Sequence, residues 1–128
     1  DEERLAILEQ LRRSYAIVDL TDNEMAKLHV RYMVGGRGRG IPDEKIYSFE
    51  FPERPGALLR FLTRMGQRGH EWNISMFHYR NHGDAYGRVL VGVQVPADGR
   101  ERFQGFVKEL GYPFQSESDN PAYALFLS

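Results

Sequence analysis

The stretch FEFPERPGALLRFL (residues 49–62) decides the fold, because in it a strand turns into a helix with almost no loop. Aromatic and acidic residues alternate as far as Pro52, which is the pattern of a half-buried β-strand. After Gly56, apolar residues recur at the three- and four-residue spacing of a helix. These apolar residues are Leu58, Phe61, Leu62 and Met65. So tight a corner predicts a β-α unit, with residues 45–51 as the strand and 57–66 as the helix.

Further strands and a second helix follow this corner. The expected strands are residues 72–80, 88–95 and 112–117. Residues 81–87 have the turn composition of a hairpin, and Asp98 is expected to cap a helix that ends at Gly111. Residues 122–127 are apolar and could add a last strand. The order over 45–117 is β-α-β-β-α-β, an α+β ferredoxin-like module with one antiparallel sheet and two helices on one face.

The residues before this unit predict a separate helix, a strand and a linker. Residues 1–13 have acids first, bases last and leucines at helical spacing, which is typical of a helix. Residues 15–20 read as a short strand. Thr21 and Glu24 have the spacing of a capping box and are expected to start a second helix. The glycine-rich residues 35–42 indicate a flexible loop and a domain boundary.

Two similar segments indicate an internal repeat. YAIVDLTDN begins at Tyr15 and YPFQSESDN begins at Tyr112, and each follows an amphipathic helix. We interpret this as a duplication in which residues 1–20 are the last helix and strand of a truncated first module. Residues 21–44 are then a linker helix and loop, and residues 45–128 are a complete module.

Composition excludes several classes of protein. The formal net charge is −1, so no basic excess points to nucleic acid or to an anionic membrane. The chain has no cysteine, which rules out disulfides and thiolate metal sites. No apolar run is long enough to span a membrane, and no signal-peptide pattern is present. A cytoplasmic location is therefore expected.

Three motifs that suggest other chemistry fit a simpler interpretation. The glycines of residues 35–40 follow a helix and precede a strand, the reverse of a dinucleotide fingerprint, so a solvated linker is expected. His70, His78 and His82 lack the spacing of metal ligands, and no metal site is expected. Residues 86–93 faintly resemble an RNA-recognition strand, but its aromatic positions are missing. No catalytic triad can be identified.

The corner itself is a candidate binding site. Pro52 and Pro55 stiffen the turn, and Gly56 allows backbone to approach a ligand. The helix that starts there offers unpaired N–H groups to a carboxylate, and Asn73 on a neighbouring strand can both donate and accept. That set of groups suits a free amino acid. The alternative is a plain stiff turn in which Asn73 satisfies backbone groups.

These residues resemble a known family. The segments YSFEFPERPGALLRFL (47–62), WNISMFHYRNHGDAYGRVLVGV (72–93) and DLTDNEMAKLHVRYMVGGR (19–37) are similar to the C-terminal regulatory region of biosynthetic threonine dehydratases. The resemblance implies two ACT-like modules in tandem. Residues 45–128 would be the second module, and residues 1–20 would be the tail of the first.

The resemblance also implies a function. The parent enzymes use pyridoxal phosphate to convert threonine to 2-oxobutanoate and ammonia in isoleucine biosynthesis, with isoleucine as inhibitor and valine as activator. The implied partners are these two effectors, the catalytic domain of the same enzyme, and further copies in a tetramer; the fragment itself could form dimers. Lys27, Lys45 and Lys108 do not match the Schiff-base lysine, so we expect no catalytic residue and no cofactor in this chain.

The effector site implied by the family covers the corner and the second strand of the module. Strand alternation puts Asn73 and Tyr79 on one face and Arg80 on the other. The implied residues are Glu53, Arg54, Pro55, Gly56, Ala57, Leu58, Asn73, Ile74, Tyr79 and Arg80.

Two functions therefore remain open. The first is an allosteric sensor that binds isoleucine or valine. The second is a structural or dimerisation module without a ligand of its own, which the partly apolar character of both faces of residues 72–80 favours.

Overall fold

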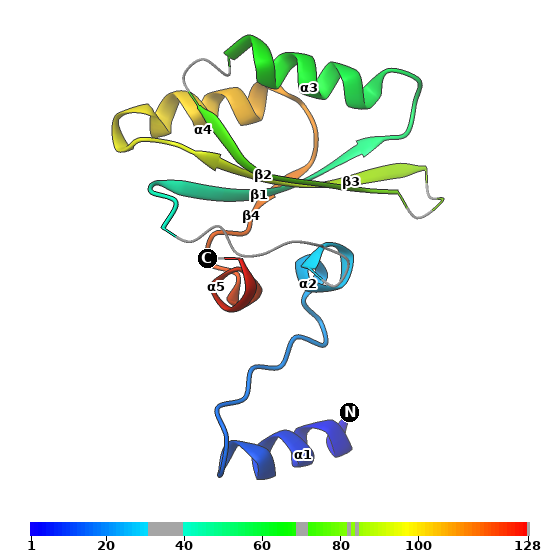
Figure 1. Ribbon diagram of the computed structural model, residues 1–128. Helices are drawn as coiled ribbons and strands as arrows, with labels where there is room; N and C mark the ends of the chain where they lie inside the picture. The colour runs from blue at the N-terminus through cyan, green and yellow to red at the C-terminus, as the bar shows by residue number, and fades with distance from the viewer. Residues whose placement is uncertain (31–39, 69–71, 82, 84, 128) are drawn as a thin grey trace.

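Four strands form one antiparallel sheet in the order β2-β3-β1-β4 (Figure 1). The computed structural model describes residues 1–30, 40–68, 72–81, 83 and 85–127. The helices are α1 (Glu2–Arg12), α2 (Glu24–Leu28), α3 (Ala57–Arg68), α4 (Arg100–Glu109) and α5 (Pro121–Phe126), with a 3-10 turn at Ala97–Gly99. The strands are β1 (Glu44–Pro52), β2 (Asn73–Arg80), β3 (Tyr86–Gln94) and β4 (Phe114–Ser116). The expected β-α-β-β-α-β order is confirmed.

Helices α3 and α4 cover one face of the sheet, which we call the α3/α4 face (Figure 1). Phe49 and Phe51 of β1 point to this face, and Phe61 of α3 packs against both rings at centroid distances of 5.2 and 6.0 Å. Phe51 and Phe61 are fully buried, which is worth about 2–3 kcal/mol for each side chain. Strand β3 and the residue after it add Val89, Val91, Val93 and Val95 to this core, and α4 adds Phe103, Phe106 and Val107.

Helices α2 and α5 lie on the opposite side, the α2/α5 face (Figure 1). Met25 of α2 and Ala122 of α5 form a second buried cluster with Ile46 and Leu90 of the sheet. The sequence predicted a strand at 122–127, and that prediction was wrong. Asn120 accepts a hydrogen bond from the Ala122 N–H (2.9 Å) and Pro121 follows it, so these residues start a helix.

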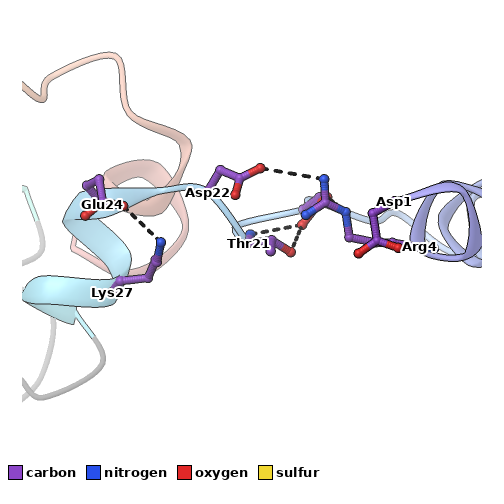
Figure 2. Close-up of polar contacts among 7 residues, drawn as sticks. Asp1, Arg4, Thr21, Asp22, Glu24 and Lys27 are labelled. Carbon is purple, nitrogen blue, oxygen red and sulfur yellow. Dashed lines mark hydrogen bonds and ion pairs between the residues drawn. The ribbon is translucent and has the colours of Figure 1, made fainter.

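The N-terminal residues differ from the sequence prediction in two further ways. Residues 15–20 form no strand, because no described segment pairs with them and an unpaired strand is not stable in water. Thr21 caps no helix; its hydroxyl and N–H both donate to Asp19, which lowers the pKa of that carboxyl (Figure 2). Asn23 caps α2 instead, accepting from the Ala26 N–H at 3.0 Å.

Helix α1 stands clear of the sheet (Figure 1), and none of its residues is buried. Arg4 connects it to the next segment through ion pairs with Asp19 (3.7 Å) and Asp22 (3.6 Å) (Figure 2). Exposed ion pairs of this length contribute little to stability. The apolar residues of α1 face solvent: Leu5 is 59% exposed and Ile7 is 51% exposed.

The start of the second module helix also differs from expectation. Asp98 lies in the 3-10 turn and makes no capping hydrogen bond; Gly99 occupies the N-cap of α4 without one. Within the 3-10 turn, the Gly99 N–H donates to the Pro96 carbonyl at 2.9 Å, so this backbone N–H before α4 has an acceptor without a capping side chain. Gly111 follows α4 with φ of +74°, as its expected role at the helix end requires.

A β-bulge interrupts β2 and changes which side chains share a face. Ile74 pairs with Val93 and Met76 pairs with Gly92, so Ser75 is an extra residue with no partner on β3. One extra residue reverses the alternation beyond it.

We predict that alanine at Gly92 destabilises the fold. A Cβ there would lie 2.7 Å from the Ser75 hydroxyl, 3.1 Å from Ile46 and 3.2 Å from Met76, so the α2/α5 face would have to open. The free energy of unfolding measured in urea should fall by about 1–3 kcal/mol. The matched control is Gly105→Ala in α4, where a Cβ meets nothing within 4 Å and alanine favours the helix. Equal losses in the two variants would contradict the prediction.

Candidate functional site

The strand-to-helix corner is held by backbone hydrogen bonds at both ends. The Glu53 N–H donates to the Ala85 carbonyl at 2.7 Å, which continues the β1–β3 pairing past Pro52. The Ala57 N–H donates to the Arg54 carbonyl at 3.0 Å. Gly56 has φ of +81°, a conformation that other residues adopt only with strain. The chain therefore reverses into α3 at Gly56.

The Glu53 side chain reaches across β3 to the end of β2. Its Oε1 accepts a short hydrogen bond from the Tyr79 hydroxyl. That bond is the main cause that raises the pKa of Tyr79. The Tyr79 ring stacks on Phe51, with ring centroids 6.1 Å apart and planes 22° apart. The corner and the end of β2 thus form one contact.

Gly87 makes this contact possible. A Cβ at Gly87 would lie 2.5 Å from Glu53 Oε1 and 3.0 Å from the Tyr79 ring. A glycine inside a strand often marks such a close approach, so Gly87 is the one residue whose position in the sequence hints at this contact.

The Glu53 carboxylate is half-buried, and within the described ranges no cation pairs with it. Its hydrogen-bond donor is the neutral phenol of Tyr79. Because a charged group removed from water favours a counter-charge, this carboxylate can receive an ammonium group.

Asn73 lies far from the corner within one chain. It pairs with Gln94, which pairs with Glu44, whereas the corner follows Pro52 at the other end of β1. Eight residue steps of strand separate the two ends, roughly 26 Å. Asn73 donates to Gln94 Oε1 at 2.7 Å. Ile74 lies at the same end and is 42% exposed.

The bulge also separates the predicted residues by face. Tyr79 pairs with Val89 and shares the α3/α4 face, and Ile74 pairs with Val93 on that same face. Asn73 and Arg80 pair with Gln94 and Arg88, so both project to the α2/α5 face. The expectation that Asn73 and Tyr79 share a face was wrong, because Ser75 shifts the alternation between them.

The other predicted residues stay at the corner. Arg54, Pro55 and Gly56 are exposed, and Ala57 and Leu58 are partly buried against the core below. The structure therefore brings together Glu53 to Leu58 with Tyr79, but neither Asn73 nor Ile74.

A cavity that sequence reasoning missed lies on the α2/α5 face and has both polar and apolar lining residues. It has a volume of about 360 Å³ and lies between α2 and the sheet. The buried Glu117 carboxylate lines it and accepts from Ser48 (2.9 Å) and Asn120 (2.9 Å). Buried His29 lines it as well. Neither residue follows a motif, so no local signal could have found them.

Several sequence predictions cannot be compared with the structure. The residues 35–39 of the glycine-rich loop, together with His70 and His82, lie outside the described residues. Among the described residues, no three His, Asp or Glu side chains form a metal-binding group. Likewise, no helix in that part of the chain is long and apolar enough to cross a membrane.

Comparison with known proteins identifies the family to which this sequence is similar. Residues 35–127 match the model of the C-terminal regulatory domain of threonine dehydratase. The chain is 54% identical over 128 residues to the L-threonine dehydratase biosynthetic IlvA of Escherichia coli K12, covering 99% of the chain and 24% of that protein. It is 54% identical over 114 residues to the protein of the same name from Burkholderia multivorans, covering 89% of the chain and 22% of that protein.

The similarity extends to a eukaryotic relative. Identity is 49% over 122 residues with the mitochondrial threonine dehydratase of Saccharomyces cerevisiae, covering 94% of the chain and 20% of that protein. The chain spans about a quarter or less of the length of these relatives. Because the family model covers most of the chain, this chain belongs to the family of C-terminal regulatory domains of threonine dehydratase.

Proposed function

We propose that this regulatory domain binds isoleucine and valine as allosteric effectors and so controls a threonine dehydratase. The observation that most supports this proposal is the Glu53 carboxylate, which is half-buried at the corner and has no cationic partner among the described residues. The parent protein would convert threonine to 2-oxobutanoate and ammonia with pyridoxal phosphate in a catalytic domain outside this chain. The names of the relatives support this reaction class.

The corner offers complementary groups to the two charged ends of an amino acid. The Glu53 carboxylate can accept the ammonium group. The N–H groups of Leu58 and Leu59 in the first turn of α3 have no intrahelical acceptor and favour a carboxylate, whereas the Ala57 N–H already donates to the Arg54 carbonyl. No acidic residue in the first turn of α3 competes with that carboxylate. The apolar part of Leu58 and the ring of Tyr79 lie beside these groups.

Asn73 and Ile74 can take part only from another copy of the module. Within one chain they lie at the far end of the sheet, and β2 is an edge strand. An edge strand has unpaired backbone groups that another copy can approach. We therefore include Asn73 and Ile74 in the proposed effector site as residues of an adjoining module. Arg80, which follows Tyr79 at the corner end of β2, stays in the proposed site on the α2/α5 face.

Effector action requires two arrangements of the module with different affinities. A ligand shifts such an equilibrium only by the difference in its affinity for the two arrangements. Isoleucine as inhibitor and valine as activator would therefore favour opposite arrangements relative to the catalytic domain.

The same proposal extends to location and cofactor. We infer no cofactor in this chain, since its lysines lack the context of a Schiff-base lysine. The cytoplasm is our proposed location, in line with the match to bacterial relatives. The yeast and tomato relatives are named mitochondrial and chloroplastic.

A second candidate function is assembly of the enzyme without a ligand of this module's own. The observation that favours it is the apolar surface of α1, where Leu5, Ile7 and Leu11 are 59%, 51% and 40% exposed. Neighbouring exposed apolar side chains often mark a contact with another chain.

Calorimetric titration tests the effector proposal. The 128-residue chain should release or take up heat with isoleucine or valine, and Glu53→Gln should weaken binding about tenfold or more. Glutamine keeps an oxygen that can accept from Tyr79 but loses the charge that the ammonium needs. Glu101→Gln on the exposed side of α4 is the matched control and should leave the affinity unchanged. Absence of heat with both amino acids at millimolar concentration would contradict effector binding by this chain.

Sedimentation tests the assembly function. If α1 is a contact surface, the chain should sediment as a dimer or larger species, and Leu5→Glu should shift it to the monomer. A charge placed in an apolar contact is costly because it loses its hydration. The assembly function fails if the unmodified chain is monomeric at every concentration measured.

A further inference from the structure

Two histidines meet where α2 lies against the sheet. Nδ1 of His29 and Nδ1 of His78 are 2.8 Å apart, so one ring donates a hydrogen bond and the other accepts it. The rings are edge to face, with centroids 5.1 Å apart. His29 is the C-cap residue of α2 and is 2% exposed, while His78 is on edge strand β2. The pair therefore connects α2 to the edge strand of the sheet.

The pair tolerates one extra proton but not two. A pair with a single added proton still has one Nδ1 that donates and one that accepts, so the Nδ1–Nδ1 hydrogen bond stays in place. A second proton must go to the accepting Nδ1, which removes the acceptor lone pair and puts two positive rings in contact. Burial and the positive charge of Arg80 both lower the pKa of His78, so the neutral acceptor form is favoured in the folded chain.

Charged groups of both signs surround the pair. Carboxylates near it would favour protonation, and Arg80 and Arg88 oppose it. The Arg88 guanidinium pairs with Glu50 at 3.2 Å, and Lys27 pairs with Glu24 at 2.9 Å, so two of the three nearby carboxylates already have a cation. Glu24 of α2, Glu50 of β1, Arg88 of β3 and Glu117 after β4 line the cavity together with His29, Lys27 of α2 pairs with Glu24, and Arg80 of β2 acts on His78.

Other contacts of the described residues also hold α2 on the sheet and on α5. Met25 packs into the cluster with Ile46 and Leu90. Asn23 exchanges two hydrogen bonds with Asn120, at 2.6 and 3.1 Å. The helix has five residues, too few to be stable without its packing. Loss of the His29–His78 contact would therefore weaken the hold on the C-terminal end of α2, to which Val30 also contributes by packing against the cluster.

We propose that the His29–His78 contact is a proton-controlled latch that holds α2 on the sheet and opens when both rings are protonated. Opening would expose Ile46 and Leu90 and the wall of the cavity that contains Glu117. The direction of the pH dependence follows from the lowered pKa of His78. The contact stabilises the closed form fully above the ordinary histidine pKa of about 6.5, and this contribution is lost as the pH falls below that value.

Hydrogen exchange measured by NMR tests the latch on the 128-residue chain. The reporters are the amides of Lys27 and His29, which donate to the Asn23 and Met25 carbonyls. The internal reference is the Leu110 amide at the end of α4. After correction for intrinsic exchange, the opening equilibrium of α2 relative to α4 should rise up to about tenfold per pH unit between about pH 6.5 and 5.5. A constant ratio over that range would overturn the proposal.

Variants separate the latch from general acid unfolding. His78→Asn places an amide where Nδ1 was, so it can keep the hydrogen bond but cannot titrate; the pH dependence of the α2 ratio should disappear. His70→Asn removes one titrating ring and leaves both members of the pair, and it should behave as the unmodified chain. The proposal fails if His78→Asn retains the full pH dependence. Should this variant not fold, His29→Asn provides the same test from the other ring.

Discussion

Strand β1 is buried on both of its faces, and the other elements are arranged to satisfy that constraint. Phe49 and Phe51 point into the α3/α4 core, whereas Ile46 points into the cluster under α2 and α5. Strand β1 also pairs with β3 along its length and with β4 at Tyr47–Phe49, and beyond β4 the Ile46 and Glu50 N–H groups donate to Ser118 and Pro113. A two-layer module would leave Ile46 and Leu90 in water. Helices α2 and α5 remove that surface, which makes the segments outside the βαββαβ unit part of its core.

The sequence predicted those parts of the fold in which local pattern and final packing agree. The corner at Pro52–Gly56 and the alternating valines of β3 have the predicted structure, and the α3 stripe buries Phe61 and Met65, although Leu62 of that stripe is 39% exposed. The predicted strand at residues 122–127 was wrong because a short apolar run fits a helix or a strand. Here Asn120 and Pro121 provide the start of a helix. The predicted strand at residues 15–20 was wrong because a strand needs a second strand to pair with, which the local sequence does not reveal. The predicted cap at Thr21 does not form because the Thr21 hydroxyl and N–H both donate to Asp19, and Asn23, two residues later, caps α2.

The candidate site was predictable at the corner and not beyond it. Glu53 to Leu58 are adjacent in sequence, so the turn alone places them together. Asn73 could not be placed by its spacing, because a right-handed crossover starts β2 at the end of the sheet opposite to the corner. The extra residue Ser75 then turned Asn73 to the other face. No pattern in the sequence predicts such a bulge. The role of Gly87 also depends on the fold, because only the structure shows that Glu53 and Tyr79 both lie where a Cβ of residue 87 would be.

The two polar contacts that distinguish this module act on adjacent residues of one strand. Tyr79 meets Glu53 on the α3/α4 face, and His78 meets His29 on the α2/α5 face. Strand β2 is an edge strand, held by β3 on one side, so it can shift more easily than β1. A ligand that draws Glu53 away from Tyr79 and a proton that separates His78 from His29 would each loosen the same strand end. If ligand binding and protonation favour the same displacement of β2, thermodynamic linkage makes their effects reciprocal. The ligand would then change the proton affinity of the histidines by the same factor by which protonation changes the ligand affinity. The bulge at Ser75 allows this arrangement, since it sets Tyr79 and His78 on the faces where their partners lie.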